Sequence, residues 1–186
     1  MNDWRCFVAV PIGDQLRAAL SSAVDVLRGA PGAEDLRWTD PSGWHATLAF
    51  LGRTDPDRVP SLADALTEVA GRFTSFTLRT GGIGGFPSPP AARVVWYGIE
   101  DPDGRLAGVA SAVREAVGLD DDQPFRPHLT LARARGDGRA RIDPAMHAPT
   151  GALRVDELVL YRSLLGGGPA RYEPLAIARL GVSVSV

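Results

Sequence analysis

The chain has 186 residues and a formal net charge of −2, and 45% of its residues are hydrophobic. This length and composition are sufficient for a substantial buried core, and the near-neutral charge excludes a protein that coats nucleic acid by charge alone. All 20 basic residues are arginine, which excludes lysine chemistry: the usual phosphate-binding loop, a Schiff base and an adenylylated lysine.

The first third of the chain is predicted to form a strand, a helix and a second strand. Residues 5–10 are rich in β-branched and aromatic side chains and end at a proline, which indicates a buried strand. Apolar residues recur at helical spacing over residues 16–27, and glycine and proline at 29–32 end this helix. After a turn at residues 40–43, the apolar run 45–51 is predicted as a strand that a glycine ends.

The next segment is predicted to be a helix, a strand and a loop. Asp55 and Pro56 are typical of a helix start, and the apolar stripe of residues 59–70 continues it. Residues 73–80 alternate like a strand. The glycine- and proline-rich residues 81–93 are predicted as a connecting loop, because no lysine or following helix supports phosphate binding there.

The second half of the chain repeats the order of the first third. A strand is predicted over residues 93–99, a helix over 106–117, a solvated acidic loop at 120–122 and a strand over 125–133. This strand, helix and strand match the earlier ones in order and spacing. We therefore expect two related lobes that face each other across a cleft in one α+β domain spanning residues 1–186.

Two last strands are predicted over residues 153–164 and 172–184, joined by a glycine-rich segment at 166–169. No apolar stretch reaches the roughly eighteen residues of a membrane span. Cys6 is the single cysteine, so an internal disulfide or a cysteine metal cluster is not expected. These features favour a cytoplasmic protein that does not associate with a membrane.

Two of the three histidines lie in the same tetrapeptide, His-x-Thr-Leu, at His45 to Leu48 and at His128 to Leu131. With 9 threonines and 20 leucines in the chain, a given histidine acquires this context by chance about once in two hundred. His147 lacks this context, and it is interpreted as a surface residue that serves as an internal control.

Strand geometry gives the duplicated motif a chemical meaning. Residues i and i+2 of a strand project from the same face, so each histidine shares a face with its threonine. Two such strands brought together present two imidazoles and two hydroxyls to one small anion, and a phosphate group fits this arrangement. Because imidazole has a pKa of about 6.5, one ring can accept a proton while the other donates one, as hydrolysis of a cyclic phosphodiester requires.

Two other interpretations fit these residues less well. A zinc site is not expected, because the spacing is not His-x₃-His and no cysteine or carboxylate lies near either histidine in sequence. No cofactor or metal is therefore predicted. The other alternative is that each histidine is an ordinary, hydrogen-bonded strand residue, and the duplication argues against it.

At these motifs the sequence resembles the 2H phosphoesterase superfamily, and within it the bacterial RNA 2′,3′-cyclic phosphodiesterases, also called 2′-5′ RNA ligases (LigT-like). The resemblance covers nearly the whole chain and is carried by RCFVAVP, HATLAFLG, FP…RVVWYG, PHLTLAR and LVLYRSLLGGGPARYEPL. It implies a bilobal α+β fold, with antiparallel sheets lining a central groove and helices outside. It also implies opening of RNA 2′,3′-cyclic phosphate ends to 2′-phosphomonoesters.

The resemblance assigns roles to individual residues. His45 is implied as the general acid on the leaving 3′ oxygen and His128 as the general base on water, although pseudo-symmetry permits the reverse. Thr47 and Thr130 are implied on the phosphate. Two further residues are implied at the site: Arg133, on the phosphate, and Phe50, stacked on a base. Strict alternation places both opposite the histidines, so each reaches the groove only if its strand ends or bulges.

The expected partner is RNA with a 2′,3′-cyclic phosphate end, or a small cyclic nucleotide, acted on by a monomer. Four further arginines have two interpretations, a basic lip for RNA or a solvated, salt-paired surface: Arg126, Arg135, Arg139 and Arg141. Two alternative functions are ATP-independent, reversible 2′-5′ RNA ligation by the same histidines and RNA binding without catalysis.

Overall fold

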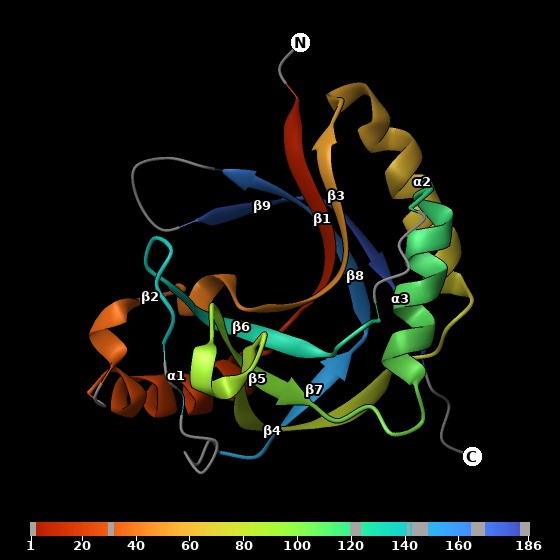
Figure 1. Ribbon diagram of the computed structural model, residues 1–186. Coiled ribbons are helices and arrows are strands. Elements are labelled where there is room, and N and C mark those ends of the chain that lie inside the picture. The colour runs from red at the N-terminus through yellow and green to blue at the C-terminus, as the bar shows by residue number, and fades with distance from the viewer. Residues whose placement is uncertain are drawn as a thin grey trace.

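The computed structural model describes residues 3–29, 32–119, 124–140, 142, 149–164 and 170–182. Within these ranges it contains three α-helices, which are α1 (Asp14–Arg28), α2 (Val59–Gly71) and α3 (Arg105–Ala116) (Figure 1). The strands in the same ranges are β1 (Trp4–Pro11), β2 (Leu36–Trp38), β3 (His45–Thr54), β4 (Phe76–Phe86), β5 (Val94–Ile99), β6 (His128–Ala134), β7 (Gly151–Val155), β8 (Glu157–Leu164) and β9 (Arg171–Arg179).

The strands form one curled sheet in the order β7-β4-β5-β6-β3-β1-β8-β9, and β2 adds to β6. All pairs between these strands are antiparallel. The sheet has two halves of four strands each, which meet between β6 and β3. One half is β6-β5-β4-β7 and the other is β3-β1-β8-β9. The pairing of Ala46 in β3 with Leu129 in β6 joins them. The predicted α+β fold with two antiparallel halves is confirmed, and the halves belong to one continuous sheet.

Two of the three helices in the described residues, α1 and α3, are exchanged between the two halves. α1 follows β1 in sequence, yet it contacts β7 of the other half, where Leu16 lies beside Gly151. Conversely, α3 follows β5 and contacts β3 and α2 (Figure 1). The strand, helix and strand repeat is therefore confirmed in order, but each repeat lends its helix to the opposite half.

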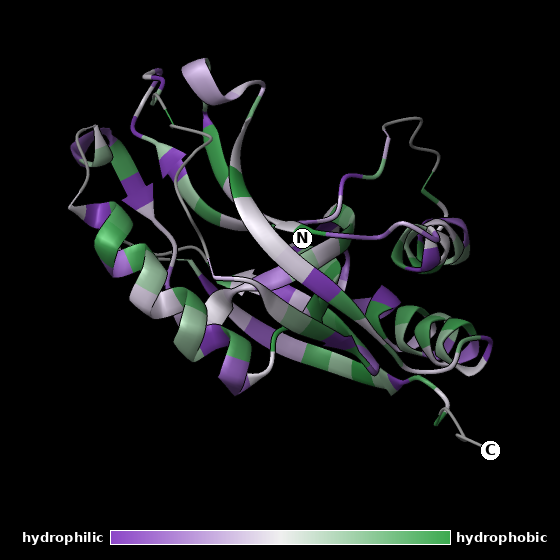
Figure 2. Cartoon of the chain, turned by 90° about the horizontal axis from the view of Figure 1, so that it is seen from below, coloured by the Kyte–Doolittle hydropathy of each residue, from purple (hydrophilic) through white to green (hydrophobic). Residues whose placement is uncertain are grey.

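The predicted helical stripes are the buried faces of the helices. In Figure 2 apolar and polar colours alternate along the helices, as expected when one side faces a core. The buried residues are Leu16, Leu20, Val24 and Leu27 in α1 and Leu62, Leu66, Val69 and Ala70 in α2. Each fully buried leucine contributes about 1.5–3 kcal/mol of transfer free energy, so this burial holds the helices against the core. No helix of the described segments is long and apolar enough to cross a membrane.

The predicted loop over residues 81–93 is wrong in its first half, because β4 continues to Phe86. The glycines are needed there for packing. A Cβ at Gly84 would lie 2.2 Å from the Trp96 ring, and one at Gly85 would lie 2.5 Å from Ala92. This segment is therefore a strand whose missing side chains admit a neighbouring indole.

Other boundaries also differ from the predictions. The strand predicted over 45–51 runs through Gly52 to Thr54, so this glycine does not end it. The strands predicted from residue 73 and to residue 184 begin at Phe76 and end at Arg179. The segment predicted as one strand over 153–164 is two strands, β7 and β8, in opposite halves of the sheet. The strand predicted over 125–133 begins at His128. The predicted start at Pro56 is a 3-10 turn over Pro56–Arg58, capped by Asp55, before α2 begins. The predicted segments 120–122 and 166–169 lie outside the described residues, as do positions 183 and 184.

Candidate active site

The two His-x-Thr-Leu motifs meet where the halves of the sheet join. Because Ala46 pairs with Leu129 in antiparallel register, the flanking residues face each other across the junction, His45 toward Thr130 and Thr47 toward His128. Ala46 and Leu129 are buried on the opposite face, at 1% and 0% exposure. The two histidines and two threonines thus share one face, called the motif face below.

Both imidazoles are held in the same way. His45 Nδ1 lies 2.7 Å from the carbonyl oxygen of Gly43, and His128 Nδ1 lies 2.6 Å from that of Arg126. A carbonyl oxygen only accepts hydrogen bonds, so each Nδ1 carries the proton and donates. Each Nε2 therefore holds the lone pair when the ring is neutral and a second proton when it is charged, which suits acid or base chemistry.

Aromatic rings fix the orientation of each histidine. The Phe7 ring stacks on His45 with centroids 4.7 Å apart, and the Tyr172 ring meets His45 edge-on at 5.1 Å. On the other half of the sheet, Phe86 meets His128 edge-on at 5.0 Å. The two His-x-Thr-Leu motifs did not indicate these rings, although Phe7, Phe86 and Tyr172 all lie in segments that carry the family resemblance. Alternation along β1 predicts that Phe7 points to one face of the sheet, but it does not predict which face.

Burial lowers the pKa of both histidines. The pKa of His45 falls from 6.5 to about 4, mainly because the ring is desolvated and also because of the positive charges of His128 and Arg133. The pKa of His128 is lowered by desolvation and by Arg133. Hydrogen bonds to Gly43 and Arg126 act in the opposite direction. Without an anion the pair is therefore mostly neutral at pH 7, and a negatively charged ligand favours a proton on one ring.

A bulge in each motif strand brings Phe50 and Arg133 to the motif face. Along β3, Val8 of β1 pairs with Ala49 but Ala9 pairs with Thr47, so Leu48 is the extra residue that precedes Phe50. A second register shift follows Phe50 and makes Leu51 an extra residue as well. The equivalent bulge in β6 is at Leu131, because Val95 and Trp96 of β5 pair with Ala132 and Thr130. Each bulge reverses the alternation that follows it.

Phe50 and Arg133 confirm this change of face. The Phe50 ring is 67% exposed and lies 6.2 Å from the Phe7 ring, which itself stacks on His45. Arg133 is exposed, and its charge lowers the pKa of both histidines. The sequence alone left this point open, and in the structure Phe50 lies against Phe7 while the charge of Arg133 acts on both histidines.

Hydrogen bonds from outside the motif strands hold the two bulges. Arg114 of α3 donates from Nε to the carbonyl oxygen of Leu48 at 3.1 Å. Thr39, which precedes β3, donates from Oγ1 to the carbonyl oxygen of Leu131 at 2.8 Å and accepts a hydrogen bond from Trp44 Nε1. Neither Arg114 nor Thr39 was predicted as a site residue, because neither lies in a motif.

The arginines of the predicted basic lip contact other residues of the chain, and their role toward RNA stays a prediction. The Arg126 guanidinium lies over the Phe86 ring at 5.7 Å. Arg135 and Arg139 donate to the backbone carbonyl oxygens of Glu34 and Ala91. Arg141 and His147 lie outside the described residues. The three arginines that are described thus have defined contacts within the chain.

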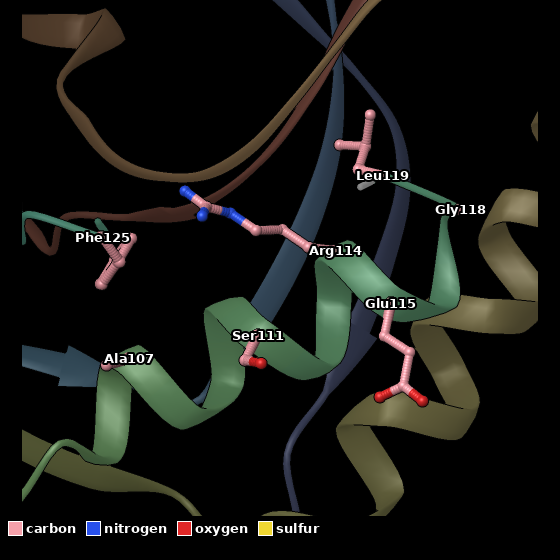
Figure 3. A pocket seen from close by; sticks show the side chains of 7 residues that line it. All are labelled: Ala107, Ser111, Arg114, Glu115, Gly118, Leu119 and Phe125. Atoms are coloured by element: carbon pink, nitrogen blue, oxygen red, sulfur yellow. The ribbon is translucent and has the colours of Figure 1, made fainter. Parts of the chain in front are cut away.

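A hollow of about 500 Å³ lies beside α3 (Figure 3). Figure 3 shows Arg114 extending from the helix beside this hollow. No residue of the motifs lines it, so the chemistry is placed on the motif face. Its lining residues are Ala107, Ser111, Arg114, Glu115, Gly118, Leu119 and Phe125.

Comparison with known proteins identifies relatives by sequence. A family model described as LigT like phosphoesterase matches residues 10–96. A protein of Archaeoglobus fulgidus named RNA 2′,3′-cyclic phosphodiesterase is 33% identical, over 70% of this chain and 73% of that protein. A protein of the same name from Methanothermobacter thermautotrophicus is 29% identical over 95% and 98%. The relative from Geobacillus stearothermophilus is 32% identical over 91% of this chain, which spans 55% of that protein's length.

Solved structures share the whole fold. The structure of TT0787 of Thermus thermophilus superposes with a TM-score of 0.79 at 28% identity, covering 97% of this chain and 100% of that one. The structure of E. coli LigT complexed with 3′-AMP superposes with a TM-score of 0.76 at 27% identity, over 96% and 99%. The curled antiparallel sheet is thus shared with these solved structures.

Proposed function

The chain belongs to the LigT-like phosphoesterase family, and on this premise we propose that it hydrolyses RNA 2′,3′-cyclic phosphate ends to 2′-phosphomonoesters. One observation carries the proposal. The antiparallel pairing of Ala46 with Leu129 sets His45, Thr47, His128 and Thr130 on one face of the sheet. The names of the curated relatives agree with this activity.

The proposed mechanism uses the free Nε2 atom of each histidine. His128 Nε2 removes a proton from a water molecule, whose oxygen then forms a bond to phosphorus. The bond from phosphorus to the 3′ oxygen breaks, and His45 Nε2 gives its proton to that oxygen. One water is consumed, and a 2′-phosphomonoester and a 3′-hydroxyl are formed. Proton transfer by each positioned group contributes typically about 10² to 10⁴-fold.

Thr47, Thr130 and Arg133 act on the phosphate oxygens in this proposal. The two hydroxyls donate hydrogen bonds to the non-bridging oxygens as negative charge builds on them, and the guanidinium adds a positive charge. Phe50, whose exposed ring lies next to Phe7, supplies a surface on which the terminal base stacks.

The acid role of His45 requires the substrate. Burial keeps the pKa of His45 near 4 in the free protein, so the ring is neutral at pH 7 and suited to accept a proton. A phosphodiester bound beside Nε2 raises this pKa, because its negative charge is attracted to the imidazolium. We propose that His45 takes up its proton as the substrate binds, which reconciles the family-based role with the burial of the ring.

The experiment that tests the function follows a 2′,3′-cyclic nucleotide by phosphorus NMR. The proposal expects one 2′-phosphomonoester product, at the same rate with and without EDTA, because the mechanism uses no metal. A 3′-phosphate product would exchange the roles of His45 and His128. No turnover of any cyclic phosphate end would overturn the proposal. Formation of a joined product from an added 5′-hydroxyl RNA end would instead support ligation.

We further propose that the monomer is the working unit and that it acts in the cytoplasm. All proposed catalytic groups lie on one chain, so a second copy has no residue to supply. Cys6 is buried and is the single cysteine, which fits a reducing compartment. Light scattering after size-exclusion chromatography checks the first statement, with a mass near 19.7 kDa expected.

A further inference from the structure

Two arginines face each other on the motif face beyond Phe50. In the register of β1 with β3, Phe7 pairs with Phe50 and Arg5 pairs with Arg53. Cys6 and Thr54, the neighbours of these arginines, are 2% and 1% exposed on the opposite face. Alternation along β1 places Arg5 on the same face as Phe7. Arg53 pairs with Arg5 beyond a second extra residue of β3, Leu51, and therefore shares this face. Both arginines are exposed.

This pair is electrostatically unfavourable as it stands. Like charges directly opposite each other on neighbouring strands destabilise a sheet. Neither Arg5 nor Arg53 forms an ion pair with any other residue of the described segments. In contrast, Arg162 on the other face pairs with Glu173 at 3.6 Å and lies over the Trp4 ring at 4.1 Å. Two arginines directly opposite each other, with no counter-charge among the described residues, form a site that an anionic ligand would stabilise.

The position of the pair relative to the site indicates what this ligand is. His45 pairs with Pro11 and Arg53 pairs with Arg5, so six residues of β1, or about 20 Å, separate the two ends. The exposed Phe50 ring lies between them. A basic surface interleaved with an aromatic ring along a strand is the pattern that binds single-stranded nucleic acid, by charge on the backbone and stacking of the bases.

We propose that Arg5 and Arg53 bind backbone phosphates of the RNA strand, upstream of the nucleotide that carries the cyclic phosphate. This inference rests on the proposed function, because the cyclic phosphate end sets the direction of the strand. With the 3′-terminal nucleotide at His45 and His128, the chain continues only in the 5′ direction. The substrate is then an oligonucleotide several nucleotides long, and a mononucleotide occupies only the catalytic end.

The test compares two substrates and two double variants. One substrate is a 2′,3′-cyclic mononucleotide, and the other is a single-stranded RNA of about ten nucleotides with a 2′,3′-cyclic phosphate end. The first variant is Arg5→Ala with Arg53→Ala. The control, Arg58→Ala with Arg72→Ala, makes the same charge change at exposed residues flanking α2. All values of kcat/KM are measured between 50 and 300 mM salt.

The proposal expects the Arg5 and Arg53 variant to lose roughly tenfold in kcat/KM on the long RNA at low salt and nothing on the mononucleotide. For the long RNA, the slope of log kcat/KM against log salt concentration becomes shallower by about 1.4, because two phosphate contacts to a single strand are removed. The control variant leaves both the rates and the slope as in the unmodified protein.

Three results would overturn the inference. Equal losses on both substrates would assign the arginines to the fold or the catalytic end. If the salt dependence of kcat/KM is unchanged, or changes equally in the control variant, Arg5 and Arg53 do not make specific phosphate contacts. If the unmodified protein has no preference for the long RNA, no upstream subsite exists. Because mononucleotide turnover is measured separately, its absence reports failure of the proposed function itself.

Discussion

At the scale of single residues, substitution of the paired histidines is the most direct test of the proposal. We expect His45→Ala and His128→Ala each to lower hydrolysis by at least about 10²-fold, because each removes one proton transfer. The assay is release of phosphomonoester from a 2′,3′-cyclic nucleotide, with circular dichroism to verify the fold. His147→Ala is the control and is expected to retain full activity. Full activity in either the His45→Ala or the His128→Ala variant would contradict the proposed mechanism.

The depressed pKa values of the histidines predict the pH dependence of the reaction. The acid must be protonated and the base neutral, and in the free protein the pKa of both rings lies below 6.5, with that of His45 at about 4. As the pH rises above these values, the protonated acid is lost. The profile of kcat/KM is therefore expected to be bell-shaped with its maximum below pH 6.5. A maximum at pH 7.5 or above would contradict the burial of the pair.

The residues that the sequence identified and those that it missed differ in how they reach the site. His45, Thr47, His128 and Thr130 are local repeats in sequence, so two motifs were enough to predict that they share a face. Phe7 acts on His45 through a neighbouring strand, and no local pattern gives strand order. Non-local packing is thus what the sequence could not supply.

At the scale of elements, the two bulges decide what surrounds the phosphate. Alternation alone would turn Phe50 and Arg133 away from the histidines, and an extra residue at Leu48 and at Leu131 turns them back. A bulge depends on the partner strand and on hydrogen bonds from outside, so periodicity within one strand does not predict it. Residues 81–86 were mispredicted for a similar reason. Their glycines are typical of a loop in sequence, and only the packing of the Trp96 ring against them explains why they form a strand.

The bulge in β6 gives a prediction at Thr39. Thr39→Val removes the hydroxyl that donates to the carbonyl oxygens at Thr130 and Leu131 and that accepts from Trp44 Nε1, while the backbone N–H of Thr39 still donates to Leu131. We expect a loss of about 1–3 kcal/mol in the free energy of unfolding, because Trp44 Nε1 loses its acceptor, and roughly a tenfold loss in kcat/KM as the bulge before Arg133 loosens. Urea unfolding and steady-state kinetics measure the two effects.

Two matched variants separate the hydroxyl of Thr39 from its methyl group. Thr39→Ser keeps the hydroxyl and is expected to restore activity and most of the stability. Thr77→Val, on an exposed position of β4, makes the same chemical change away from the site and leaves both measurements unchanged. An active, fully stable Thr39→Val protein would show that the β6 bulge does not need the side-chain hydrogen bond of Thr39.

At the scale of the whole molecule, the exchange of helices ties the two halves of the sheet together. α1 covers the half opposite to the strand that it follows, and α3 reaches back to β3, where Arg114 holds the Leu48 carbonyl oxygen. The sequence predicted the repeat, but a repeat of this kind is compatible with a helix that packs on its own half of the sheet and with one that packs on the opposite half. Only the packing of α1 on β7 and of α3 on β3 settles which of the two occurs.

Folding buries one imidazole from each half, and this makes the stability of the molecule depend on pH. The pKa of His45 is about 4 in the folded chain and about 6.5 when unfolded. Between these values the unfolded chain binds more protons, so acid favours unfolding. At pH 5 this single group lowers the free energy of unfolding by about 2 kcal/mol relative to pH 7.5, and His128 adds to the loss in the same direction.

Urea unfolding at pH 7.5 and pH 5 measures this dependence. We expect His45→Phe, which keeps a ring against Phe7 but does not titrate, to lose less stability than the unmodified chain as the pH falls. Added inorganic phosphate is expected to restore stability to the unmodified chain at pH 5, because the anion favours the charged ring in the folded state. If the unmodified chain and the His45→Phe variant lose the same stability in acid, His45 is not buried as described, and the proton uptake proposed for catalysis has no basis.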